Sequence, residues 1–195
     1  MLVKILENER VKNMRVTNNL QFVITLIKKG IFMITLKVEK ENRELNQDYY
    51  DLIIRNIDIH SLECTCGRHD MVVHSYYSRN IKTESGVIKL DILRVKCKEC
   101  GKTHAVLLSL IVPYQCVELE RQIQILKDED VEKIMVNNEA IDEQEVYRIR
   151  NRFKTKYKKW MSLNKLSFLD DLVKLAFRDF KSNFMQIRKG CYNLI

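Results

Sequence analysis

The pattern of apolar and polar positions divides the chain into a strand-rich part and a later helix-rich part. Two runs, at 71–81 and 87–96, are rich in β-branched and aromatic residues, and the turn sequence Thr83-Glu84-Ser85-Gly86 joins them. They predict an antiparallel hairpin. A third strand is expected at 103–108, with weaker strands at 21–27 and 31–38 and a short helix within 45–60.

Beyond Pro113 the apolar residues recur at the spacing of helices. One helix is expected at 118–127. Asp142, with Glu145 three residues later, resembles a capping box and predicts a long helix that reaches about residue 161. Its apolar residues form a single stripe, namely Val146, Ile149, Phe153, Tyr157 and Trp160. Segment 128–161 therefore fits a helix, a turn at 137–141 and a second helix.

Two closely spaced cysteine pairs flank the predicted hairpin. Cys64 and Cys66 precede it, Cys97 and Cys100 follow it, and a glycine comes directly after each pair. Two tight turns can deliver four thiolates to Zn²⁺, and glycine allows each turn a positive φ. We therefore predict a structural zinc site. His69 is an alternative ligand to Cys64, because only one residue separates the first pair; buried thiols and a redox pair are the other interpretations.

Strand, cysteine turn and strand on either side describe a zinc ribbon, in which metal substitutes for a core that a small sheet cannot build. The expected fold is α+β: a three-stranded antiparallel zinc ribbon followed by a helical, helix-turn-helix-like region at 128–161. The expected domains are an N-terminal extension (1–44), the ribbon (45–114) and the helical region (115–195). We also hypothesise that residues 1–32 are an over-called start and that the natural product begins at Met33. Lys28-Lys29-Gly30 requires purine-rich codons, which are correctly placed to be a bacterial ribosome-binding site before Met33. A genuine N-terminal hairpin is the alternative.

Charge is segregated along the chain. The formal net charge is +8 and the pI is about 9.1. Residues 117–145 hold ten acidic side chains, whereas 146–161 hold seven basic and no acidic ones. Such an excess of positive charge attracts polyanions, nucleic acid before membrane surfaces. No apolar run is long enough to span a bilayer and no secretory signal is visible, so we expect a cytoplasmic protein without a membrane partner.

The basic helix offers a surface for double-stranded DNA. In a major groove, Arg148, Asn151 and Arg152 would approach base edges and the lysines would approach phosphates. The predicted nucleic-acid contacts are Arg148, Arg150, Asn151, Arg152, Lys154, Lys156, Lys158 and Lys159, with Arg79, Arg94 and Lys96 from the strands. The alternative is a solvated positive face that pairs with the acidic segment 128–145.

Several motifs are similar to those of known proteins, namely Cys64-Thr65-Cys66-Gly67 and the stretches 74–79, 93–104 and 111–114. They resemble the N-terminal zinc ribbon of certain bacterial insertion-sequence transposases, and more closely a family of short stand-alone bacterial proteins of unknown function that share this ribbon. In the transposases a helix-turn-helix follows and both parts contact terminal DNA, so the resemblance implies DNA binding. The helical residues after the ribbon are too few for the ribonuclease-H-like catalytic domain of those transposases.

The sequence therefore favours a non-catalytic DNA-binding protein related to transposase DNA-binding regions, as a remnant or an accessory factor. Zn²⁺ is the expected cofactor and double-stranded DNA the expected partner. The sequence shows no nucleophile with a paired base and no phosphate-binding loop, so we expect neither an enzyme nor a small-molecule substrate. The alternative is a protein–protein adaptor whose charged helices form an interface.

Overall fold

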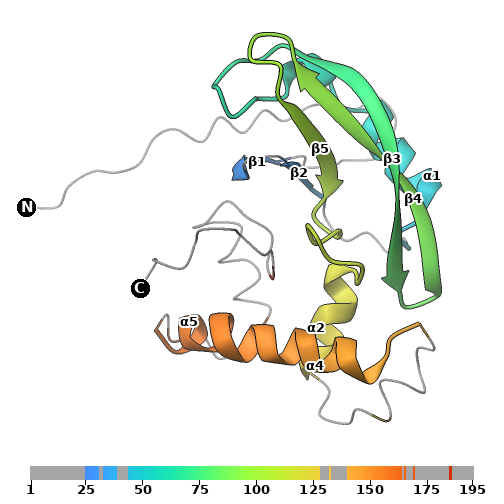
Figure 1. Cartoon of the computed structure of the whole chain (residues 1–195), viewed down its shortest axis with the longest axis vertical. Coiled ribbons are helices and arrows are strands. Elements are labelled where there is room, and N and C mark those ends of the chain that lie inside the picture. The colour runs from blue at the N-terminus through green and yellow to red at the C-terminus, as the bar shows by residue number, and fades with distance from the viewer. Residues whose placement is uncertain are drawn as a thin grey trace, which may run out of the picture.

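The structure, a computed structural model, describes residues 25–30, 33–38, 44–127, 132, 140–163, 165, 169 and 185 (Figure 1). The strands are β1 (Thr25–Gly30), β2 (Met33–Lys37), β3 (Met71–Thr83), β4 (Gly86–Cys97) and β5 (Thr103–Leu108). The α-helices are α1 (Gln47–Arg55), α2 (Leu119–Lys127), α4 (Glu143–Arg152) and α5 (Lys158–Leu163). A 3₁₀ turn occupies Ile59–Ser61, and a π-helical stretch, Phe153–Tyr157, joins α4 to α5.

The strands form one mixed sheet in the order β1-β2-β5-β4-β3. β3 pairs antiparallel with β4, and β4 with β5, as predicted. However, β2 pairs in parallel with β5, and β1 pairs antiparallel with β2. The prediction of a ribbon of three antiparallel strands alone is therefore wrong. The burial of β5 agrees with this arrangement: β5 is buried from His104 to Leu108, which is typical of an interior strand of a sheet that is covered on both faces.

Helix α1 packs against the sheet through Tyr50. This side chain is fully buried, and its hydroxyl donates to the Val106 carbonyl at 2.8 Å while it accepts from the Leu93 amide at 2.9 Å. Burial raises the pKa of the Tyr50 hydroxyl, so it keeps the proton that it donates. Asn46 caps the start of the helix, because its side chain accepts from the Tyr49 amide. One aromatic residue thus connects α1 to both β4 and β5.

The buried residues form two clusters that adjoin near residue 111. The first lies between the sheet and α1 and extends along the chain to Ile111. The second begins at Val112 and includes apolar residues of α2 and α4, with Leu169 and Met185. Within the described ranges, no helix has both the length and the apolar character needed to cross a membrane.

The long helix predicted at 142–161 is present, with one irregularity. Asp142 caps it by accepting from the Glu145 amide at 2.8 Å, as the sequence predicts. The Thr155 hydroxyl donates to the Asn151 carbonyl at 2.8 Å, inside the turn where the helix becomes π-helical. A π turn holds an extra residue, so side chains beyond it are rotated relative to a uniform α-helix. Most of 128–141 lies outside the described residues, and the helix-turn-helix stays a prediction.

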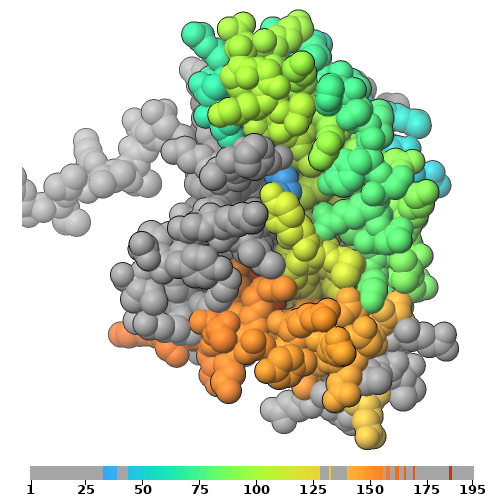
Figure 2. Space-filling model, in the orientation of Figure 1, coloured from blue at the N-terminus to red at the C-terminus, as the bar shows by residue number. Residues whose placement is uncertain are grey.

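The β3–β4 hairpin extends from one end of the sheet to the other (Figure 1). Cys97 ends β4 at one end, opposite Met71 in the register, and the turn after Thr83 lies at the other. β3 has 13 residues, which at about 3.3 Å each correspond to roughly 40 Å. The helices α2 and α4 lie at the hairpin-turn end, where Figure 2 shows the described side chains from residue 140 onward in orange.

Candidate metal centre

Two tight turns carry the four cysteines. In the second turn, the Gly101 amide donates to the Cys97 carbonyl at 2.9 Å, four residues back. In the first, the Gly67 amide donates to the Cys64 carbonyl at 2.9 Å, only three residues back. The first turn is therefore one residue tighter, which accommodates the shorter Cys64–Cys66 spacing without displacing either sulfur.

Both glycines have the left-handed backbone that the sequence predicts. Gly67 has φ +84° and Gly101 has φ +70°. A residue with a Cβ pays about 1–2 kcal/mol in this region, which explains why glycine follows each pair. The turns thus depend on glycine for their conformation rather than for space, since an added Cβ would meet nothing within 4 Å at either position.

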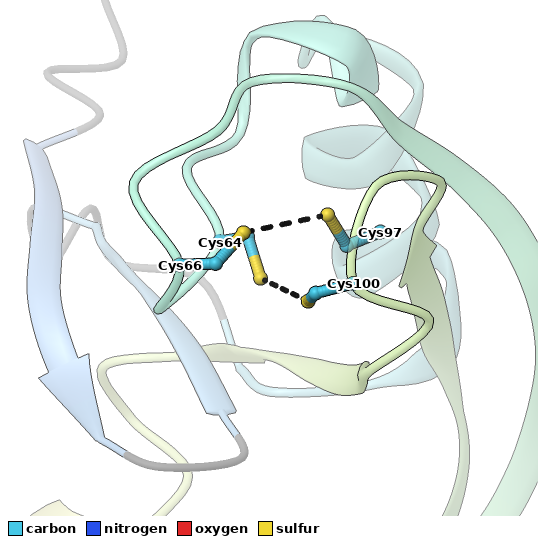
Figure 3. Close-up of side chains that lie close together, drawn as sticks. All are labelled: Cys64, Cys66, Cys97 and Cys100. Carbon is cyan, nitrogen blue, oxygen red and sulfur yellow. Dashed lines mark hydrogen bonds between the residues drawn. The ribbon is translucent and has the colours of Figure 1, made fainter.

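The four sulfur atoms converge on one point between the turns (Figure 3). The Sγ atoms of Cys64 and Cys100 are 3.4 Å apart, and those of Cys66 and Cys97 are 3.8 Å apart. All four lie within 4.8 Å of one another and none forms a disulfide. With metal–sulfur bonds of about 2.3 Å, a tetrahedral site has sulfur–sulfur edges of about 3.8 Å. The cluster therefore fits a metal ion.

The site is buried on one side and open on the other. Cys64 and Cys97 are 2% and 0% exposed, whereas Cys66 and Cys100 are exposed. Burial raises the pKa of the Cys64 thiol to about 12, and a cation beside it would reverse this shift by stabilising the thiolate. Ligand ionisation and metal binding are therefore linked at this position.

The two histidines near the cluster differ in their relation to it. His69, the predicted alternative ligand, is exposed; its Nδ1 lies 2.9 Å from the Ser61 carbonyl and it does not join the cluster. The second histidine, His104, lies on β5, and the sequence analysis gave it no role. Its Nε2 lies 3.3 Å from Cys64 Sγ, and the side chain is only 1% exposed. The sequence signal was a histidine beside the apolar run Ala105–Leu108 of the strand that follows the second turn.

Comparison with known families covers this same region. Residues 64–148 match a domain of unknown function (DUF6431). The matched DUF6431 region begins at the first cysteine and ends within α4, and it covers less than half of the chain. No curated protein and no solved structure matches the chain. The family description names neither a zinc ribbon nor a transposase, so that resemblance stays a prediction.

Beyond the centre, the DUF6431 region includes the start of the predicted basic surface. Four of the predicted contacts on the helix are exposed: Arg148, Asn151, Lys154 and Lys158. Arg150 is half-buried, and the side chains of Lys156 and Lys159 lie outside the described residues. Among the described side chains, the exposed contacts therefore lie at 148, 151, 154 and 158, and Arg152 is not one of them.

Two of the predicted contacts instead hold the loop that follows Pro113. Arg152 is half-buried and donates to the Gln115 side chain, and Arg79 donates to the carbonyls of Gln115 and, at 2.8 Å, Val112. Burial lowers the pKa of both guanidinium groups. These two arginines connect β3 and α4 through one loop, so their positive charge faces protein carbonyls. Sequence alone could not separate them from exposed cations.

The two remaining strand residues are exposed. Arg94 stacks over the Tyr77 ring at 4.9 Å from its centroid, and Lys96 lies on the same strand two residues closer to the cysteines. Both lie on β4 at the end near the metal centre, far along the hairpin from α4.

Proposed function

We propose that the chain is a non-catalytic DNA-binding protein whose sheet is held at one end by Zn²⁺. The convergence of four sulfur atoms at tetrahedral separations carries the metal part of this proposal. Zn²⁺ is favoured because four thiolates and no carboxylate form the donor set, and thiolates select soft or borderline ions. With all four positions taken by protein ligands, no position is left for a substrate, which favours a structural ion.

The exposed row on α4 and α5 supports the DNA part. Arg148, Lys154 and Lys158 are exposed, and Asn151 lies between them with a side chain suited to base edges. The opposite side of α4 is anchored by Val146 and Ile149, at 1% and 3% exposure, so the row faces outward from a fixed helix. The resemblance to transposase DNA-binding regions points in the same direction.

Metal content tests the first part. Protein purified without a metal-affinity tag should contain one zinc per chain by elemental analysis, and Cys97→Ser should lose it. Cys116→Ser is the matched control, because Cys116 lies outside the cluster. A wild-type protein without metal, with both variants folded alike, would overturn the zinc proposal.

Salt-dependent binding tests the second part. The triple variant Arg148→Ala/Lys154→Ala/Lys158→Ala removes three exposed cations from one helix. If each contacts a phosphate, the slope of log K against log salt should become about 2.7 less steep, and affinity at physiological salt should fall on the order of 100-fold. A mobility shift on mixed-sequence duplex DNA, repeated at several salt concentrations, measures both.

The control removes the same charge elsewhere. Lys37, Arg55 and Lys89 are exposed on β2, α1 and β4, and their joint change to alanine leaves α4 untouched. The control variant should keep the wild-type slope. Equal losses from both triple variants would mean that net charge, and not the α4–α5 row, attracts the DNA.

One observation favours the adaptor as a second candidate. Tyr147 and Tyr114 are 69% and 66% exposed, the most exposed large apolar side chains among the described residues. Exposed tyrosines are common anchors of protein interfaces. Absent or salt-insensitive DNA binding, together with a partner whose binding is lost in Tyr147→Ala, would favour the adaptor.

A further inference from the structure

His104 occupies a position in the sheet that is set by pairing rather than by the cysteine turns. It lies on β5 directly opposite Val95 of β4, two residues before Cys97. The register therefore directs its ring to the side of the sheet on which Cys64 and Cys97 are buried. Its Nε2 is 3.3 Å from Cys64 Sγ, while its Nδ1 is buried and has no hydrogen-bond partner among the residues that the structure describes.

The geometry makes His104 a neighbour of the cluster and not a member of it. Among the described residues, the group whose donor atoms all lie within 4.8 Å of one another consists of the four cysteines and does not include His104. His104 contacts one sulfur from outside. A metal-bound Cys64 sulfur carries no proton, so a hydrogen bond between the two atoms requires the proton on Nε2.

The choice of tautomer follows from burial. With the proton on Nε2, Nδ1 is left as a buried acceptor without a partner. With the proton on Nδ1, a buried N–H would be unpaired. The lone pair of Nε2 would then point at the lone pairs of an anionic sulfur. Buried donors without a partner are rarer than under-satisfied acceptors, and the second arrangement is also electrostatically repulsive.

We propose that His104 is a positioning residue of the metal centre, which donates Nε2–H to the Cys64 thiolate. This inference rests on the proposed zinc site. The donor offsets the cost of holding an anionic sulfur at 2% exposure and fixes the direction of that sulfur toward the ion. Cys64 needs such a donor because it is the buried member of the tighter turn.

Loss of an outer hydrogen bond of this kind weakens metal affinity by about 10–100-fold. His104→Leu should show such a loss in competition with a chromogenic chelator, and His104→Gln, which keeps an N–H donor, should recover most of it. His69→Leu is the matched control, since His69 also follows a cysteine pair closely in sequence yet is exposed and outside the cluster. If His104→Leu loses metal affinity and His104→Gln does not recover it, His104 contributes packing alone and the proposal is overturned.

A test on the unmodified chain avoids any variant that fails to fold. In protein loaded with ¹¹³Cd²⁺ in place of Zn²⁺, a scalar coupling should pass from the metal through Cys64 Sγ to the Nε2 proton of His104. Direct metal–nitrogen coupling would make His104 a ligand and overturn the proposal. Absence of any coupling in a protein that binds the ion through four sulfurs would overturn it while leaving the zinc site intact; failure to bind metal at all would instead remove the zinc proposal.

Discussion

The pair formed by Lys82 and Glu145 should be the strongest single electrostatic contact between the sheet and the basic helix. Lys82 Nζ donates to Glu145 Oε2, and the Cys116 thiol donates to Oε1 at 3.2 Å. The two charged side chains are 23% and 11% exposed, so the carboxylate is the more buried partner. Lys82→Met therefore removes the cation and leaves an anion with little access to water.

The structure sets the expected size of this effect. Removing one partner of a fully buried pair costs about 3–5 kcal/mol. Partial exposure of both groups and the remaining thiol donor reduce this to about 2–3 kcal/mol for Lys82→Met, while Glu145→Gln should cost about 1 kcal/mol because Lys82 can turn toward solvent. The double variant should reveal a coupling energy of about 1–3 kcal/mol.

Urea unfolding followed by circular dichroism, with zinc in excess, measures the four free energies. Lys98→Met is the matched control: its partner, Asp70, lies 3.2 Å away, but the two side chains are 55% and 37% exposed. That change should cost less than about 1 kcal/mol. If Lys82→Met costs no more than Lys98→Met and the coupling is zero, the pair does not hold the helix against the sheet.

Three further predictions concern single positions. Gly101→Ala should lower the free energy of unfolding by about 1–2 kcal/mol in the same urea assay. This cost is conformational, because the alanine Cβ would meet no atom within 4 Å. Gly101→Asn should cost less, because asparagine tolerates the positive φ. Iodoacetamide should alkylate Cys116 at pH 8 more slowly than a cysteine in an unstructured peptide, although the residue is exposed. Partial desolvation of its thiol and then the Glu145 carboxylate raise the pKa of that thiol and reduce the thiolate fraction. Peptide mass spectrometry should show faster labelling in Glu145→Gln, and an unchanged rate would contradict this reasoning. Chelation should increase amide hydrogen exchange at Cys97 while the amide of Val146 in α4 stays protected, and equal exposure of both would show that the metal supports the whole chain.

Local patterns predicted the elements that rest on neighbouring residues. The hairpin, the strand at 103–108 and the capped helix after Asp142 all follow from alternation, turn residues and capping signals within a few positions of one another. The convergence of the cysteines was predictable for the same reason, because two short turns at the ends of one hairpin meet whenever its strands pair.

The features that sequence reasoning missed depend on partners distant in the chain. Nothing near His104 shows that Cys64, forty residues earlier, lies beside it. Arg79 and Arg152 have the same charge as exposed arginines, and only the position of the loop at Gln115 turns them inward. The π turn at Phe153–Tyr157 was likewise missed, because a helical pattern assumes a constant period.

The parallel pairing of β2 with β5 affects how the chain is made. β2 leaves the ribosome long before its partner, since Met33 pairs with Ala105. At about 5–20 residues per second, β2 waits roughly 4–14 s for β5 to be synthesised. During this time its apolar residues Ile34 and Leu36, buried in the finished sheet, are open to other chains. Production at lower temperature, or with chaperones that bind extended apolar segments, should therefore increase the soluble yield.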